Sequence, residues 1–159
     1  MNIFDNYIHS LLSELNSQEV QYLIVGGYAV NFHGFRRTTG DIDLWVKPDN
    51  GENKKRLLDC LRNLSVSEKK LKQLDKLDFT KPHVFVDGEE PFKIDFLTKI
   101  SNVNFEEAWE KRIIAELDGL YIPFLHLNDL VRSKFSTGRP QDKIDIETLQ
   151  KIQQLKKKK

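Results

Sequence analysis

Residues 26–44 read GGYAVNFHGFRRTTGDIDL and directly follow the apolar run QYLIV at residues 21–25. The run is rich in residues that favour β-structure, so we expect a buried strand that ends at the two glycines. The segment DIDLWV at residues 41–46 alternates carboxylate and apolar residues and predicts a second strand. Because residues two apart share a face of a strand, Asp41 and Asp43 are expected to point the same way.

Two neighbouring carboxylates repel each other, so we expect a positive group between them. Hard divalent cations such as Mg2+ prefer carboxylate oxygens and keep substrate phosphates among their ligands. Gly26 and Gly27 have no side chains, so backbone N–H groups can approach a phosphate closely. A short helix that begins near Tyr28 would direct its N-terminus at the same anion. The pattern therefore indicates a site for metal and phosphate.

Thirteen residues separate the glycine pair from the Asp41-x-Asp43 motif. This arrangement resembles the signature of the nucleotidyltransferase superfamily, which has the DNA polymerase β-like fold. It is most similar to small bacterial members, such as antibiotic nucleotidyltransferases and the nucleotidyltransferases of toxin–antitoxin and abortive-infection systems. These proteins have a third carboxylate on a later strand, and Asp95 in the run FKIDFL matches it. The resemblance covers residues 20–100, with a looser similarity at residues 130–149.

The resemblance implies transfer of a nucleoside monophosphate from a nucleoside triphosphate, such as ATP, to an acceptor hydroxyl, with release of pyrophosphate. Asp41, Asp43 and Asp95 would be the catalytic residues and would bind two Mg2+ ions, which Mn2+ could replace. Gly26 and Gly27 would let the backbone reach the β and γ phosphates. Asp95 would also serve as general base. Without these roles, the first two aspartates would face solvent on an edge strand or turn, and Asp95 would be an ordinary exposed strand residue.

Further candidates for phosphate or nucleotide contacts carry a positive charge or a hydroxyl group. Arg36 or Arg37 would hold the triphosphate, because arginine combines a fixed charge with paired donors. The alternative for both is a salt bridge to an acidic loop. Thr39, together with Thr38, would bind phosphate or cap a turn. Lys134 resembles a lysine that approaches the nucleotide in small nucleotidyltransferases, and its alternative is a solvated position on a helix.

The composition is that of an ordinary globular chain of 159 residues with a net charge of +1. This charge gives no strong general attraction to nucleic acid. Cys60 is the single cysteine, which excludes an intrachain disulfide and fits a reducing cytoplasm. The sequence contains no apolar run long enough for a transmembrane helix and does not begin like a signal peptide, so we expect a cytoplasmic protein without a membrane partner.

The remaining pattern predicts an α/β (α+β) fold, a mixed β-sheet flanked by helices. Helices are expected at residues 4–15, after a turn at 48–51, and at 68–77, 104–109, 129–135 and from 142 onward. Strands are expected at residues 83–86 and 92–97, and as a hairpin at 112–117 and 120–125. The strand that carries Asp95 should neighbour the strand that carries Asp43. A nucleotidyltransferase domain would span residues 1–125, and a C-terminal helical segment, residues 126–159, would pack on it.

Several side chains carry more specific expectations. Asn128 should cap the helix at residues 129–135. Ile113 should cover the core, and Leu155 should face inward from the last helix. His33 should be packed or capping rather than a metal ligand, because no second His or Cys lies at metal-binding spacing. Asp142 and Asp145 should be capping or structural residues rather than catalytic ones.

The sequence leaves the acceptor and the biological context open. One alternative is a component of a toxin–antitoxin pair that modifies RNA or a partner protein. Another is a catalytically silent regulatory or binding module, since a fold does not by itself fix an activity. A third alternative is a generic α/β scaffold in which the Asp-x-Asp motif is accidental. The acceptor side of so small a transferase could be completed by a protein partner or by a second copy in a homodimer.

Overall fold

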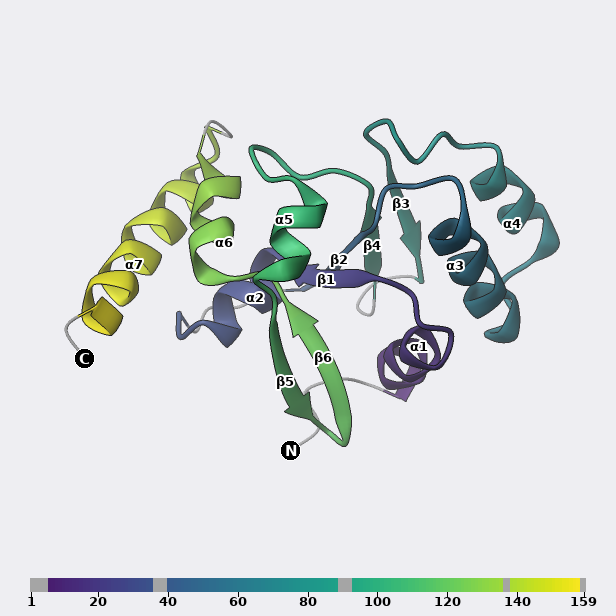
Figure 1. Cartoon of the computed structure of the whole chain (residues 1–159), viewed down its shortest axis with the longest axis horizontal. Helices are drawn as coiled ribbons and strands as arrows, with labels where there is room; N and C mark the ends of the chain where they lie inside the picture. Colours follow the sequence, from purple (N-terminus) through teal and green to yellow (C-terminus); the bar gives the residue numbers. More distant parts are fainter. Residues whose placement is uncertain (1–5, 36–39, 89–92, 136–137, 158–159) are drawn as a thin grey trace.

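The computed structural model describes residues 6–35, 40–88, 93–135 and 138–157. A six-stranded sheet forms its centre, with the strand order β3-β4-β2-β1-β6-β5 (Figure 1). The strands are β1 (Tyr22–Val25), β2 (Ile42–Val46), β3 (Val84–Asp87), β4 (Ile94–Leu97), β5 (Ile113–Leu117) and β6 (Leu120–Phe124). The helices are α1 (Asn6–Ser17), α2 (Gly26–Phe32), α3 (Glu52–Asn63), α4 (Glu68–Asp75), α5 (Phe105–Glu110), α6 (Leu127–Lys134) and α7 (Pro140–Lys157).

The sheet is mixed, which confirms the predicted fold class. Strand β1 pairs antiparallel with β2 and parallel with β6, and β2 pairs parallel with β4. The other two pairings, β3 with β4 and β5 with β6, are antiparallel. The central strands are buried on both faces, as their nearly continuous apolar sequences require. The expected neighbourhood of the Asp43 and Asp95 strands is therefore present.

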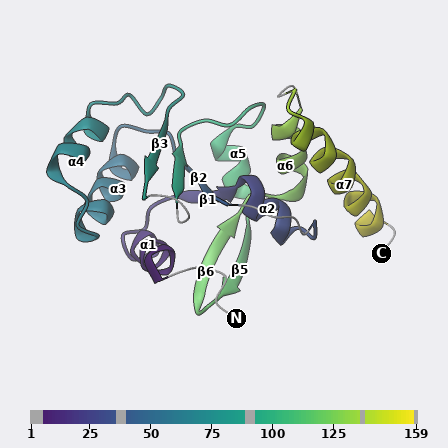
Figure 2. The ribbon, with the colours of Figure 1, turned by 180° about the vertical axis from the view of Figure 1, so that it is seen from behind.

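Helices cover both faces of this sheet. On one face, the Tyr22 hydroxyl donates to Asn16 of α1 at 2.9 Å. On the other face, Trp45 packs edge-on against Phe105 of α5, with ring centroids 4.9 Å apart. Figures 1 and 2 show α3 and α4 at one end of the molecule and α6 and α7 at the other, while the β5–β6 hairpin projects from the centre. The core cluster extends into α6 and α7 through buried aliphatic side chains, including Leu130 and Leu149.

The structure corrects three of the side-chain predictions. The cap of α6 is His126, whose Nδ1 accepts the backbone N–H of Asn128 at 3.0 Å, so Asn128 is not the capping residue. Ile113 is 37% exposed and does not cover the core, because it lies on the outermost strand. Leu155 is 62% exposed, because it lies near the end of α7, six residues beyond Leu149, the last buried residue of this helix. None of the described helices has both the length and the apolar character needed to cross a membrane.

Candidate functional site

Two carboxylates stand side by side on neighbouring strands. Asp43 of β2 and Asp95 of β4 are directly paired in the parallel register, so both side chains lie on the same face of the sheet. The two carboxyl groups share a hydrogen bond. Burial, and after it the charges of Asp95 and Asp41, raise the pKa of Asp43 to about 7. Protonation of Asp43 relieves the repulsion between the two carboxylates, and a bound cation would relieve the same repulsion.

One oxygen of this pair has no partner within the described part of the chain. Asp95 Oδ1 is buried, and no described group donates a hydrogen bond to it. Such a buried acceptor is unfavourable unless a donor or a cation completes it. The pairing of Asp43 with Asp95 and the unsatisfied oxygen therefore fit a site for a hard divalent cation.

The chain approaches this pair most closely at Gly26. Gly26 has a φ of +66°, and a Cβ built at this position would overlap Asp43 Oδ2. Only glycine satisfies both conditions. Helix α2 begins at Gly26 itself, two residues earlier than the expected start near Tyr28, and Gly27 is buried in its first turn. The junction of β1 and α2 thus brings backbone, rather than side chain, up to the Asp43 carboxylate.

Asp41 lies next to the pair but has a partner of its own. It precedes β2, and its carboxylate forms an ion pair with Lys93 at 3.4 Å. Its charge still contributes to the raised pKa of Asp43. Among the described residues, no three His, Cys, Asp or Glu side chains are grouped as metal ligands. The structure therefore brings Asp43 and Asp95 together. Asp41 lies beside them and is paired with Lys93.

Lys134 is buried at the end of α6 rather than solvated. Its ammonium group contacts Asp142 Oδ1 at 2.9 Å and Asp145 Oδ2 at 3.0 Å, both on α7. Arg139 also pairs with Asp142, at 3.1 Å. The charge of Lys134 lowers the pKa of Asp43, against the effect of burial, so the lysine acts on the carboxylate pair electrostatically. Asp142 and Asp145 thus orient a cation, a structural role that agrees with the expectation for them.

These groups line one cavity of about 410 Å³ between the sheet and α6. Gly26, Asp43 and Asp95 form its floor, and Lys134 and Arg139 lie on its α6–α7 side. Sequence reasoning missed Arg139 and also Lys99, which lines the cavity just after β4. The signal for Arg139 was its place in the GRPQD segment that follows Lys134.

A protein-family profile matches almost the whole sequence. Residues 3–158 match the profile of a family described as "Nucleotidyltransferase of unknown function (DUF6036)". The chain belongs to this nucleotidyltransferase family. The predicted superfamily and the predicted type of enzyme are thereby confirmed at the level of the family. No curated protein sequence matches the chain.

Solved structures confirm the fold of this nucleotidyltransferase. The lincosamide antibiotic adenylyltransferase LnuA, bound to lincomycin, is similar with a TM-score of 0.51 and 17% identity, over 96% of this chain and 99% of that one. ANT(2'')-Ia in complex with adenylyl-2''-tobramycin has a TM-score of 0.54 and 16% identity, over 93% and 91% of the two chains. A nucleotidyltransferase from Thermotoga maritima has a TM-score of 0.52 and 15% identity, over 94% and 88%. At these identities, the likeness concerns the fold.

Three predicted phosphate contacts of the nucleotidyltransferase, Arg36, Arg37 and Thr39, lie outside the described residues, as does Thr38. His33 is buried, and its Nε2 lies 2.7 Å from the backbone oxygen of Leu125. This packed position agrees with the role expected for it.

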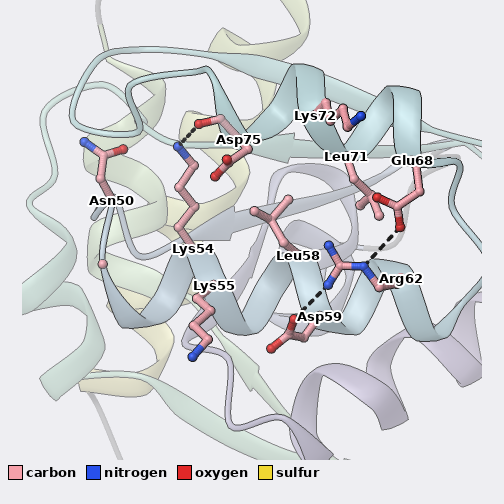
Figure 3. Close-up of a pocket in the computed structure, with 11 residues that line it drawn as sticks. Asn50, Lys54, Lys55, Leu58, Asp59, Arg62, Glu68, Leu71, Lys72 and Asp75 are labelled. Atoms are coloured by element: carbon pink, nitrogen blue, oxygen red, sulfur yellow. Dashed lines mark hydrogen bonds and ion pairs between the residues drawn. The ribbon is translucent and has the colours of Figure 1, made fainter.

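A second cavity of the nucleotidyltransferase, of about 280 Å³, lies between α3 and α4, away from Asp43 and Asp95 (Figure 3). Several of its charged side chains bond to one another or to the backbone. Lys54 donates to the backbone oxygen of Asp75 at 2.6 Å, and Arg62 pairs with Asp59 at 3.0 Å and with Glu68 at 3.2 Å. These contacts explain how α4 is held on α3 and indicate no reaction chemistry.

Proposed function

We propose that this nucleotidyltransferase transfers a nucleoside monophosphate from a nucleoside triphosphate to an acceptor hydroxyl and releases pyrophosphate. The observation that carries the proposal is the Asp43–Asp95 pair, half-buried on adjacent strands, lining a cavity and closely approached by Gly26. Asp95 Oδ1 is buried and accepts no hydrogen bond from the described residues, which is unfavourable unless a donor or a cation completes it. Family membership supports the same class of reaction.

Asp43 and Asp95, with Asp41 at the edge of the site, are the residues that would hold the divalent cations. Carboxylate oxygens suit Mg2+ and, with similar chemistry, Mn2+. When bound, two such ions neutralise phosphate charge and clamp the attacking and leaving oxygens. Binding them would need Asp43, whose pKa is raised to about 7, in its charged form, and would replace the ion pair of Asp41 with Lys93.

The chain's own groups then orient the substrates. The Gly26–Gly27 backbone admits the β and γ phosphates at close range, and Lys134 supplies fixed positive charge, held in place by Asp142 and Asp145. Arg36, Arg37 and Thr39 remain proposed phosphate contacts. Asp95 accepts the proton of the acceptor hydroxyl as the new bond to the α-phosphorus forms and the bond to pyrophosphate breaks.

ATP is the first donor to test, because two structurally similar proteins are described by their adenylyl chemistry. Both are also described with antibiotics, so a small-molecule alcohol is the acceptor class that we favour. We also propose a bacterial, cytoplasmic protein, which the free thiol of Cys60 and the proposed use of nucleoside triphosphates support. A macromolecular acceptor or a homodimer would need surfaces beyond this cavity.

The test is thermal unfolding with each of the four ribonucleoside triphosphates, with and without Mg2+ or Mn2+. A ligand that binds the native state alone raises the apparent stability by mass action. We expect a metal-dependent increase with ATP that disappears in the double variant Asp43→Asn/Asp95→Asn. Asp59→Asn, which alters a carboxylate at the second cavity, is the matched control and should keep the increase. Unchanged metal-dependent binding in the double variant would refute the proposal.

A further inference from the structure

The floor of the cavity is an ordered row of residues across four strands. The registers place Val25 of β1, Asp43 of β2, Asp95 of β4 and Val86 of β3 in line. Laterally paired residues of a sheet project from the same face. The carboxylate pair therefore has the β1 end and Gly26 on one side and strand β3 on the other.

The β3 side is apolar and open. Val84 is 61% exposed and Val86 is 39% exposed, and Val84 is paired with Leu97 of β4. Phe85, between the two valines, stacks on Phe96 on the opposite face, with ring centroids 4.9 Å apart, so the valines face the cavity side. We call Val84, Val86 and Leu97 the apolar shelf. Val84 and Leu97 line the cavity itself.

The opposite side of the cavity is cationic. Lys134 of α6 and Arg139 line it, and the charge of Lys134 acts on Asp43. The third cation of the lining, Lys99, follows β4 and is exposed. A triphosphate is stabilised by these charges and by close backbone approach, and neither is offered by the side chains of the apolar shelf. The donor phosphates thus belong to the Gly26 and Lys134 side.

In-line transfer then fixes the place of the acceptor. The attacking oxygen and the leaving pyrophosphate lie on opposite sides of the α-phosphorus. With pyrophosphate at the Gly26 side, the attacking hydroxyl approaches over Asp95, from strands β4 and β3. The shelf borders this approach directly, because Val86 is the lateral neighbour of Asp95.

We propose that the apolar shelf is the acceptor subsite and that it selects a small-molecule alcohol with an apolar face over a polyamine. This inference rests on the proposed transferase function. The volume of about 410 Å³ lies in the range of small-molecule sites. Among the described residues that line the cavity, the carboxylates are Asp43, Asp95 and Asp142, and Asp142 is paired with Lys134, so none is placed on the shelf to receive an amine.

The binding test uses the full chain and N-phenyl-1-naphthylamine, a neutral aryl fluorophore. Val84→Asn/Val86→Asn should weaken its binding about tenfold, because two polar amides then replace the apolar contacts without adding charge beside Asp95. Ile114→Asn, at a 54% exposed position on the opposite edge strand, is the control and should not weaken it. Thermal unfolding checks that all variants remain folded. Retained binding in the double variant, or equal loss in the control, would overturn the assignment.

Competition separates the acceptor from the donor. Phenyl β-D-glucopyranoside, an alcohol with an aryl face, should displace the fluorophore, whereas 2-deoxystreptamine, a cationic amino alcohol, should not. ATP with Mg2+ should also leave the fluorophore bound, and the double variant should keep its metal-dependent stabilisation by ATP. Displacement by ATP would assign the shelf to the donor base, and displacement by the amino alcohol, or none by the glucoside, would reject the stated selectivity. If ATP failed to stabilise the wild-type chain, the proposed function would fail, independently of these results.

Discussion

Gly26 lies so close to Asp43 that any Cβ at position 26 would overlap the Asp43 carboxylate. The same residue has a φ of +66°, which L side chains rarely adopt. A glycine is therefore required here for two reasons, and both concern the backbone that lies next to the carboxylate pair.

Gly26→Ala should destabilise the protein more than Gly119→Ala. Gly119 has a φ of +81° but nothing near the position of a Cβ, so its substitution incurs backbone strain alone, about 1 kcal/mol. At Gly26, overlap with Asp43 adds about 1–3 kcal/mol. Urea unfolding measures both values. Equal costs for the two variants would show that Gly26 has no steric contact with Asp43, and Gly26→Ala should also weaken metal-dependent ATP binding.

Asp43 should make the stability of the metal-free protein depend on pH. Its pKa is raised from 3.8 to about 7, so between these values the native state holds a proton that the unfolded chain has lost. The contribution of Asp43 to the free energy of unfolding is full at a pH below its pKa in the unfolded chain. It is lost as the pH rises through its pKa in the folded protein. Asp43→Asn removes this dependence, because an amide can donate to Asp95 at every pH.

Urea unfolding across this pH range, in the presence of a chelator, tests the effect. Asp43→Asn should be more stable than wild type above the folded-state value of about 7 and should show a flatter pH profile. Asp59→Asn, on the exposed face of α3, is the control. A steep pH profile that survives in Asp43→Asn would show that other groups produce it.

The sequence predicted the sheet around the site because its signals there are local. An apolar strand, a glycine pair and carboxylates at period-two spacing mark the position of Asp43, and the resemblance to nucleotidyltransferases pointed to Asp95 on a later strand. Pairing of the two strands brings these residues together. The state of the pair was not predictable in this way. The raised pKa of Asp43 depends on burial by elements that are distant in the sequence.

The failures lie where tertiary contacts decide. Asn128 matches the statistics of helix caps, but His126 occupies the capping position because α6 begins earlier than its apolar pattern suggested. Leu155 continues the apolar spacing of α7 beyond the part of the helix that contacts the core. The solvated alternative for Lys134 is wrong, because two aspartates of the next helix enclose its ammonium group, and nothing in its local sequence indicates this. Its contact with the nucleotide stays a prediction.

Lys134→Met should strongly destabilise the protein. The substitution removes the ammonium group that Asp142 and Asp145, both buried, share, and leaves the 77% exposed Arg139 as the charged partner of Asp142. Breaking a buried pair typically costs about 3–5 kcal/mol. Lys111→Met is the matched control. Lys111 pairs with buried Asp129 at 3.1 Å but is itself 44% exposed, and Arg132 remains as a second partner, so about 0–1 kcal/mol is expected.

Urea unfolding of both lysine variants provides the comparison. The triple variant Lys134→Met/Asp142→Asn/Asp145→Asn should recover much of the lost stability, because it removes the uncompensated charges together with the lysine. Similar small costs for Lys134→Met and Lys111→Met would show that Lys134 is not an obligatory partner of the two aspartates.

His33 should make the protein less stable in mild acid. Burial, and more weakly the charges of Lys156 and His126, lower the pKa of His33 below its ordinary value of 6.5, whereas its hydrogen bond to the backbone oxygen of Leu125 acts in the opposite direction. The native state therefore keeps His33 neutral, while the unfolded chain takes up a proton as the pH falls through 6.5. The contribution of His33 to the free energy of unfolding is full at a pH above 6.5, and it is lost as the pH falls toward the lower pKa of the folded state.

His33→Gln keeps a donor for Leu125 and cannot titrate, so it should flatten the acid side of the stability profile measured by urea unfolding. His126→Gln should flatten it to a lesser extent, because His126 is less buried. A profile in His33→Gln that falls as steeply as in wild type would show that the histidine is accommodated in its charged form.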